Sequence, residues 1–198
     1  MINLNLGCGG VLKAGFINVD KFYTKEELQG KKGFFENVIY PDGAEYVQAD
    51  ICKLPFEDNF ADYAESLDVV EHMGIYEIFT YMKEIRRVLK PGATLFLLTP
   101  DFTGLAMDWI RLMINEKEFN FESYIQIAEQ IYGNQRAGGE FHKSAMSPNF
   151  IRFVLEKTGW SSCSIEGFVK NTPCKQIYDN ELSSGFARCD MLKIKAVK

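Results

Sequence analysis

Two short segments near the start of the chain carry residues that could bind a nucleoside. The first joins an apolar run, Leu4–Leu6, to a turn with Gly7 and Gly9, and the second, Phe16–Asp20, ends in a carboxylate. Glycine lets the backbone come close to a ligand, and a carboxylate can accept two hydrogen bonds from the vicinal hydroxyls of a ribose. Because ligands of open α/β sheets bind at the carboxyl ends of strands, we expect both segments to face one nucleoside-containing cofactor.

The spacing of the glycines distinguishes between nucleoside cofactors. In the dinucleotide pattern G-x-G-x-x-G the third glycine would fall at Leu12, and its absence removes the close helix packing that seats a pyrophosphate. A nicotinamide-dependent oxidoreductase is therefore the less favoured enzyme. Gly7-x-Gly9 followed by Asp20 resembles the first motif of the class I S-adenosylmethionine-dependent methyltransferases, small members of which have a Leu-Gly-Cys-Gly turn. The resemblance implies S-adenosylmethionine as the cofactor, bound by Leu6, Gly7, Cys8, Gly9 and Asp20.

Two features depart from that family pattern. Asn5 stands where many members carry an acid, and the connection from Gly10 to Asn18 is too short for a crossover helix. These departures keep open an alternative of another class: a non-catalytic domain that retains the methyltransferase fold and serves as a binding partner.

A second acid stands at the end of the next expected strand, Tyr46–Asp50. In the methyltransferase family an Asp at this place resembles the residue that binds the adenine amino group, and Ile51 matches the apolar neighbour that packs on the ring. A carboxylate offers only lone pairs to the hydrogens of an amine, so the pairing is chemically reasonable. The alternative is that Asp50 caps the turn that follows it.

The fourth expected strand, Phe60–Leu67, leads into a segment that resembles the methionine-binding part of the family. Ser66 and Leu67 fall where members line the methionine end of the cofactor, close to the transferable methyl group. The next residue is Asp68, whereas relatives often have His or Asn there, so the carboxylate could mean a different acceptor.

Three residues are candidates for catalysis. If the acceptor is an amine or a hydroxyl, its proton must leave, and Asp68, His72 or His142 could assist. The pair Glu71-His72 matches a Glu-His helix start that is typical of the family, and there the pair can serve mainly to stabilise a loop. For both histidines a structural hydrogen bond is therefore the alternative role.

Hydrophobic periodicity predicts most of the remaining elements. Apolar residues at three- and four-residue steps indicate a helix over 75–89 that Pro91-Gly92 stops. The continuous apolar run 93–99 indicates a strand inside a sheet. Ser147-Pro148 begins a helix that Gly159 ends. Further helices are expected over 105–114 and 121–132, and strands over 162–167 and 190–197.

The resemblance combines these elements into an α/β fold. It implies a Rossmann-like, mostly parallel seven-stranded sheet with an antiparallel last strand and helices on both faces. Residues 1–198 are expected to form a single methyltransferase domain, with residues about 102–146 as a helical lid over the acceptor site. Residues 21–45 are expected either as a loop folded on the sheet edge or as a flap over the adenosine.

Composition restricts the remaining possibilities. The chain has 198 residues, 46% of them hydrophobic, and its net charge of -5 disfavours a domain built to hold nucleic acid. Five cysteines without a C-x-x-C pair indicate neither a disulfide framework nor a zinc site, and we expect no metal. No apolar run reaches the length of a membrane span, and the first strand starts almost at Met1, so we expect a cytoplasmic protein without a signal peptide. The expected acceptor is a small molecule or a sugar-containing metabolite.

Overall fold

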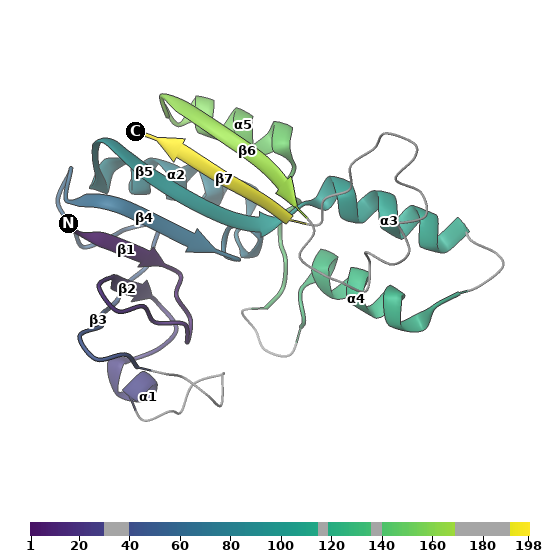
Figure 1. Cartoon of the computed structure of the whole chain (residues 1–198), viewed down its shortest axis with the longest axis horizontal. Coiled ribbons are helices and arrows are strands. Elements are labelled where there is room, and N and C mark those ends of the chain that lie inside the picture. The colour runs from purple at the N-terminus through teal and green to yellow at the C-terminus, as the bar shows by residue number, and fades with distance from the viewer. Residues whose placement is uncertain (30–39, 115–118, 136–139, 169–190) are drawn as a thin grey trace.

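The computed structural model describes residues 1–29, 40–114, 119–135, 140–168 and 191–198. Its strands are β1 (Asn3–Leu6), β2 (Ile17–Asp20), β3 (Glu45–Gln48), β4 (Ala61–Leu67), β5 (Leu89–Pro100), β6 (Ser162–Phe168) and β7 (Met191–Val197). In the described residues these strands form one seven-stranded sheet in the order β3-β2-β1-β4-β5-β7-β6 (Figure 1). β7 pairs antiparallel with β5 and β6, and the other neighbours pair in parallel. The predicted sheet is confirmed.

Helices lie on both faces of the sheet. α2 (Ile75–Val88) and α5 (Pro148–Lys157) pack on one face, and α1 (Lys25–Gln29) lies beside β3 on the other. Neighbouring side chains of a strand point to opposite faces. On β3, Val47 packs with the core under α2 and α5, whereas Tyr46 packs with Leu28 of α1. The remaining helical segments are η1 (Val70–His72), α3 (Phe102–Ile114) and α4 (Phe121–Tyr132).

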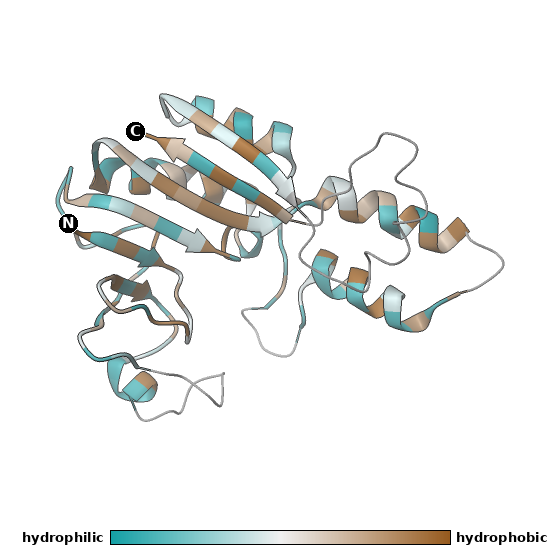
Figure 2. Cartoon of the chain, viewed as in Figure 1, coloured by the Kyte–Doolittle hydropathy of each residue, from teal (hydrophilic) through white to brown (hydrophobic). Residues whose placement is uncertain are grey.

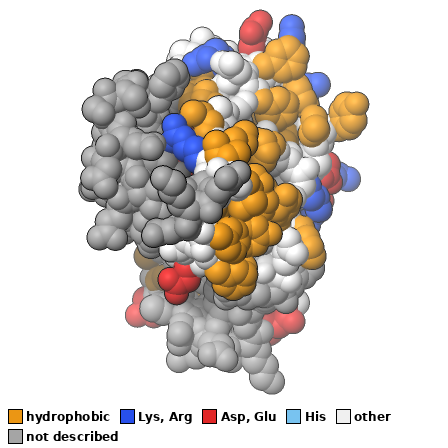
Figure 3. All heavy atoms as spheres, turned by 90° about the vertical axis from the view of Figure 1, so that its right-hand side faces the viewer, with side chains coloured by type: hydrophobic (Ala, Val, Ile, Leu, Met, Phe, Trp, Pro, Cys, Tyr) orange, Lys and Arg blue, Asp and Glu red, His pale blue; other side chains and the backbone are white. Residues whose placement is uncertain are grey.

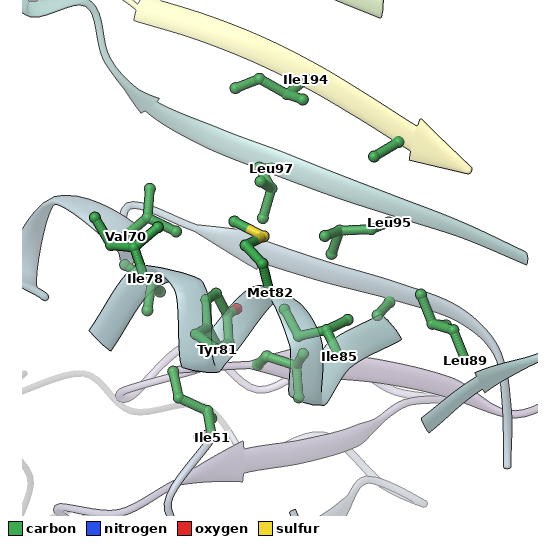
Figure 4. Close-up of a cluster of buried hydrophobic side chains, with 14 of the residues drawn as sticks. Ile51, Val70, Ile78, Tyr81, Met82, Ile85, Leu89, Leu95, Leu97 and Ile194 are labelled. Atoms are coloured by element: carbon green, nitrogen blue, oxygen red, sulfur yellow. The ribbon is translucent and has the colours of Figure 1, made fainter. Parts of the chain in front are cut away.

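The main core lies between α2, α5 and the central strands. Figure 4 shows Ile78, Met82 and Ile85 of α2 together with Leu95 and Leu97 of β5. Each of these side chains is at most 3% exposed. Complete burial of a side chain of this size contributes about 1.5–3 kcal/mol. The core therefore holds the central strands and α2 as a rigid base, at whose edge the carboxyl ends of the parallel strands meet.

The end of α2 differs slightly from the prediction. Val88 is the last residue of the helix, and Leu89 already pairs with Ala61 of β4. The β4–β5 pairing then shifts and resumes between Tyr63 and Thr94, so Pro91-Gly92 lies within an irregularity of β5. An irregular stretch tolerates both the missing N–H of proline and the φ of +78° at Gly92.

A polar network explains how β1 and β2 pair without a crossover helix. The buried Asn5 side chain donates to the Val11 carbonyl and to Asn18 Oδ1, both at 2.9 Å. Asn18 Oδ1 also accepts from the Lys13 amide at 2.8 Å, and the Lys13 ammonium forms an ion pair with Glu65 of β4. An aspartate at position 5 could not donate to the Val11 carbonyl. The departure from the family pattern at Asn5 thus stabilises the short connection.

α3 and α4, the two helices predicted after β5, pack against each other beyond its carboxyl end (Figure 1). The ring centroids of Trp109 and Tyr124 lie 5.0 Å apart between them. At the base, the Phe102 amide donates to the Met146 carbonyl at 2.8 Å, so the two ends of the segment 102–146 meet. Brown bands on both helices in Figure 2 and orange side chains in Figure 3 mark their apolar character. The exposed apolar residues on the two helices and at their ends are Phe102, Met107, Ile110, Met113, Ile114, Phe119, Phe121, Ile125 and Tyr132.

The segment after β2 is only partly described. α1 begins at the predicted cap, where Thr24 Oγ1 accepts from the Glu27 amide at 3.2 Å and the Glu27 carboxylate accepts from the Thr24 amide at 2.7 Å. Residues 30–39, which belong to the possible flap, lie outside the described residues, as do residues 169–190. Across the described ranges, no helix combines the length and the apolar character needed to cross a membrane.

Candidate active site

The glycine turn after β1 forms part of the wall of a cleft. Gly7 and Gly9 have φ values of +69° and +51°, in the left-handed region that favours glycine. The amides of Gly7 and Cys8 donate to the Val19 carbonyl at 2.8 and 3.1 Å. These hydrogen bonds fix the turn against the end of β2.

Asp20 ends β2 beside that turn. The residue is 6% exposed, its Oδ2 accepts from the Gly9 amide at 2.9 Å, and its Oδ1 accepts from the Phe22 amide at 2.8 Å. Each carboxylate oxygen carries two lone pairs, so both oxygens can accept one further hydrogen bond. The arrangement fits a ribose whose two hydroxyls donate to the same carboxylate.

The cleft has two lobes, which share the residues Gly7, Asp20, Phe22, Asp68 and His72. The first lobe has a volume of about 460 Å³ and is also lined by Asp50, Ile51, Val69, Met73, Glu77 and Lys143. The second has a volume of about 620 Å³, reaches the lid segment, and is also lined by Cys8, Gly9, Leu67, Glu71, Glu129 and His142. Volumes of this size suit small-molecule ligands. The cleft therefore has room for a cofactor and a second small molecule.

The structure brings most of the predicted site residues together at this cleft. Those that line it are Gly7, Cys8, Gly9, Asp20, Asp50, Ile51, Leu67, Asp68, His72 and His142. Leu6 and Ser66 do not line either lobe. Leu6 is fully buried in the main core, and the Ser66 side chain is buried beside Tyr81 of α2. These two residues support neighbours that face the cleft.

Asp50 caps a turn and also lines the cleft. Its Oδ1 accepts from the Cys52 amide at 2.9 Å, so the side chain does cap the following turn. The same residue lines the first lobe together with Ile51, which is 8% exposed. Because a carboxylate has four lone-pair sites, capping the turn is compatible with accepting a hydrogen bond from an adenine amine.

Burial keeps the thiols of the cleft protonated. Burial, aided by the charge of Asp20, raises the pKa of Cys8 to about 12. Burial, aided by the charge of Asp50, raises the pKa of Cys52 to about 11. Nucleophilic cysteine chemistry requires a thiolate, so neither thiol is suited to act as a nucleophile at neutral pH.

Asp68 stands where the two lobes join. Its φ of +54° is in the left-handed region, which Asp tolerates better than most residues. Its amide donates to the Leu98 carbonyl of β5 at 2.9 Å, and its side chain is exposed. The residue thus ends β4 in a sharp turn at the junction of the lobes.

His72 and His142 meet at the second lobe although they are far apart in the sequence. Their ring centroids lie 4.8 Å apart in an edge-to-face arrangement. Nδ1 of His72 lies 3.1 Å from the Phe141 carbonyl oxygen, and Nδ1 of His142 lies 2.9 Å from the Gln130 carbonyl oxygen. Both histidines therefore make the structural hydrogen bonds that were one of their two expected roles, and both still line the cleft.

Burial also determines the charge of the two imidazoles. It lowers the pKa of His72 below the ordinary histidine value, and the charges of Asp68 and Glu140 offset this only in part. Burial lowers the pKa of His142 as well, and the neighbouring His72 adds to the effect. Both rings are thus neutral at neutral pH, where each can accept a proton or bind a metal ion.

Several cleft residues were not predicted from the sequence. Phe22 lines both lobes and is 65% exposed. An aromatic residue two positions after a strand-end acid, with no place in the strand pattern, is the signal that could have found it. Glu129 and Gln130 of α4 line the second lobe. They had no such signal, because the face that α4 turns to the cleft depends on how the lid packs.

Gly7→Ala is expected to destabilise the fold through two separate effects. A left-handed φ costs a side-chain-bearing residue roughly 1–2 kcal/mol, and a Cβ at Gly7 would lie 2.7 Å from Cγ2 of Val69. Crowding of this kind costs roughly 1–3 kcal/mol more. Chemical denaturation should show that Val69→Ala relieves the second effect in the double variant. Gly15→Ala, which has a φ of +75° and no atom within 4 Å of its added Cβ, is the control for strain alone. Additivity of Gly7→Ala and Val69→Ala would contradict the crowding.

The chain is similar in sequence to known methyltransferases. Residues 4–97 match the methyltransferase domain family. A mitochondrial ubiquinone biosynthesis O-methyltransferase from Mus musculus is 26% identical over 182 residues, which cover 85% of this chain and 43% of the relative. A sterol 24-C-methyltransferase from Gibberella zeae is 32% identical over 100 residues, which cover 45% of this chain and 25% of the relative. The chain thus spans less than half the length of these relatives.

The fold is similar to a solved structure over the whole chain. A SAM-dependent methyltransferase from Archaeoglobus fulgidus aligns with a TM-score of 0.59 and 18% identity, covering 100% of this chain and 86% of that one. At this identity the likeness concerns the fold. The matched domain spans the glycine turn, Asp20 and the strands that carry the cleft. Residues 4–97 thus match the methyltransferase domain family, and the whole chain has the fold of a solved SAM-dependent methyltransferase.

Proposed function

We propose that this protein transfers a methyl group from S-adenosylmethionine to a small-molecule acceptor. The observation that carries the proposal is the position of Asp20, whose buried carboxylate ends β2 and binds the Gly9 amide of the glycine turn. Leu12, at the place of the third dinucleotide glycine, is 7% exposed and packs with Leu28. The site therefore favours a nucleoside without a pyrophosphate.

The first lobe is the proposed place of the cofactor. Asp20 would bind the ribose, and Asp50 and Ile51 would bind the adenine, since all three line this lobe. The methionine part would extend toward Leu67 and Asp68, where the first lobe joins the second. The methyl group would then lie at the entrance of the second lobe.

The second lobe is the proposed place of the acceptor, and residues about 102–146 are its proposed lid. Glu129, Gln130 and His142 of that segment line the lobe. The sulfonium is already an activated donor, so the main task of the protein is to hold donor and acceptor in line, roughly 3–3.5 Å apart. Asp68, His72 and His142 line this lobe, and they are the proposed groups to accept a proton from the acceptor. The names of the relatives include an oxygen and a carbon methyltransferase, so the acceptor atom stays open.

Two other functions would use the same cleft. A non-catalytic domain would bind S-adenosylmethionine without turning it over, and an oxidoreductase would bind a nicotinamide cofactor instead. The seat of a pyrophosphate is disfavoured by Leu12, as described above. Methyl transfer is therefore the preferred function, and turnover is the property that distinguishes it from binding alone.

The test combines binding and turnover. Calorimetric titrations of the purified chain with S-adenosylmethionine, S-adenosylhomocysteine and NADH should give micromolar binding of the first two and none of the third. Incubation with S-adenosylmethionine and a panel of phenols, alcohols, amines and sugar-containing metabolites should then release S-adenosylhomocysteine, detected by mass spectrometry. Binding without release for any acceptor would favour the non-catalytic domain, and binding of NADH alone would overturn the methyltransferase function.

The cytoplasmic location expected from the sequence stays a prediction. The mitochondrial location in the name of the ubiquinone enzyme from Mus musculus belongs to that protein. Fractionation of cells that express the tagged chain would test the location directly.

A further inference from the structure

Three metal-ligating side chains converge at the second lobe. Glu71 and His72 come from η1, and His142 comes from the segment that returns from the lid. One carboxylate oxygen of Glu71 and one ring nitrogen of each histidine all lie within 4.8 Å of one another. These are the only two histidines of the chain. Distant segments thus bring all of its imidazoles to one point beside a carboxylate.

The hydrogen bonds of the histidines fix which ring nitrogen is available. A carbonyl oxygen can only accept, so Nδ1 of His72 donates to Phe141, and Nδ1 of His142 donates to Gln130. In a neutral imidazole the other nitrogen, Nε2, then carries the lone pair. Histidines that bind metals usually donate their second ring nitrogen to a carbonyl or a carboxylate in this way. Both rings thus make the carbonyl hydrogen bond that is usual for a histidine that binds a metal.

Burial and hydrogen bonds also fix the position of Glu71. The residue is 2% exposed, and its Oε2 accepts from Thr99 Oγ1 at 3.0 Å. Its carbonyl accepts from the Lys143 amide at 2.7 Å, which ties η1 to the segment that carries His142. A buried carboxylate beside two lone-pair nitrogens forms a set of electron-pair donors that a divalent cation satisfies.

We propose that Glu71, His72 and His142 bind a divalent transition metal at the floor of the second lobe. Two imidazoles and one carboxylate suit Zn²⁺, Co²⁺ or Fe²⁺ better than Mg²⁺ or Ca²⁺, which prefer oxygen ligands alone. Three protein ligands leave a coordination position open, as catalytic metal sites do. All three residues line the second lobe, so the open position faces the space proposed for the acceptor.

The metal would also narrow the acceptor class, and this step rests on the methyl transfer proposed above. With a metal bound, the coordinating nitrogens of His72 and His142 could not accept the proton of the acceptor. The metal would lower the pKa of a hydroxyl or phenol at the open position, and the proton would pass to water. The resulting oxygen anion attacks the methyl carbon of the sulfonium. A C–O bond forms, the C–S bond breaks, and neutral S-adenosylhomocysteine leaves. The site therefore favours an oxygen acceptor over an amine.

Metal binding is testable without any acceptor. The full chain, freed of metal with a chelator, is titrated with CoCl₂ and with ZnCl₂ by calorimetry, and the Co²⁺ form is examined by visible absorption. We expect one equivalent of each metal to bind and the Co²⁺ form to show d–d bands with imidazole ligation. Nitrogen NMR of the chain labelled at histidine should show two rings protonated at Nδ1, both of which shift on addition of zinc.

Variants assign the ligands. Loss of a group that is hydrogen-bonded to a metal ligand weakens metal binding roughly 10- to 100-fold, and Thr99→Val should fall within that range. His142→Asn and His72→Asn, which remove proposed ligands, should each weaken metal binding by more. Glu156→Gln is the control for Glu71→Gln. It changes an exposed acid on α5, and this control variant should bind metal like the wild type. Wild-type affinity in both histidine variants, or no stoichiometric binding by the wild type, would overturn the site. Binding of S-adenosylmethionine without binding of a metal would overturn the proposed metal site alone. Binding of a metal without binding of S-adenosylmethionine would overturn only the proposed methyltransferase function.

Discussion

Asp20→Ala is expected to lose measurable binding of S-adenosylmethionine. The carboxylate is proposed to accept both ribose hydroxyls, and hydrogen bonds to a charged group contribute roughly 1.5–3 kcal/mol each. Loss of two such bonds weakens binding by at least about 100-fold. The substitution also removes the acceptor of the Gly9 and Phe22 amides, which Asp20 holds at 2.9 and 2.8 Å. The glycine turn and the chain after β2 lose their common anchor, and this further weakens binding.

The measurement is a calorimetric titration of each variant, with thermal unfolding measured alongside. Asp20→Asn keeps the shape and one acceptor oxygen, so its affinity should lie between those of the wild type and Asp20→Ala. Asp42→Ala, an exposed acid that lines neither lobe, is the matched control and should bind like the wild type. Wild-type affinity in a folded Asp20→Ala protein would remove Asp20 from the cofactor site.

Gly133→Ala is expected to slow turnover by roughly 100-fold while leaving cofactor binding nearly intact. Gly133 ends α4 with a φ of +81°, and a Cβ there would lie 1.7 Å from the Glu140 carbonyl oxygen. The backbone of Glu140 must therefore move, and with it the nearby His142, whose amide donates to the Tyr132 carbonyl at 3.1 Å. A misplacement of about 1 Å in a positioning group can cost roughly 100-fold in rate. Gly133 lines only the second lobe, so S-adenosylmethionine in the first lobe should be little affected.

The control for this prediction separates strain from collision. Gly43→Ala introduces the same left-handed strain, with a φ of +75°, but has no atom within 4 Å of its added Cβ. It should lose roughly 1–2 kcal/mol of stability and keep its turnover. Rates of S-adenosylhomocysteine release at saturating cofactor, measured beside calorimetric affinities, distinguish the two variants. Equal loss of binding and turnover in Gly133→Ala would show that the lid and the cofactor site are not separable.

Local patterns predicted most of the fold because each one has a local cause. The three- and four-residue steps from Ile75 onward gave α2, and Ser147, whose Oγ accepts from the Phe150 amide at 3.3 Å, marked the start of α5. The strand-end acids Asp20 and Asp50 both line the first lobe, because the ends of parallel strands meet at one edge of the sheet. Alternation could not show that the Ser66 side chain turns to α2 rather than to the cleft.

The rest of the site depends on contacts between distant segments. His142 reaches His72 because the backbone of the returning lid segment pairs with η1, and no spacing in the sequence encodes that contact. The same is true of Glu129, which depends on the packing of α4 on α3. Asn5 looked like a departure from a family motif, and its meaning emerged only with its partners Val11 and Asn18. These parts of the site could not be predicted from local sequence patterns, because they depend on contacts between residues that are far apart in the sequence.

The place of β7 in the sheet has a consequence for synthesis of the chain on the ribosome. β7 lies between β5 and β6 in the sheet. The edge of β5 at which Leu95 and Leu97 pair with β7 therefore has no partner until residues 191–197 have emerged from the ribosome. At roughly 5–20 residues per second, the wait between the end of β5 and the end of β7 is roughly 5–20 s. An unpaired strand edge attracts other chains during such a wait. Each residue inserted in the lid would lengthen the time for which this edge of β5 is unpaired. A longer lid would therefore increase the risk that the nascent chain associates with other chains.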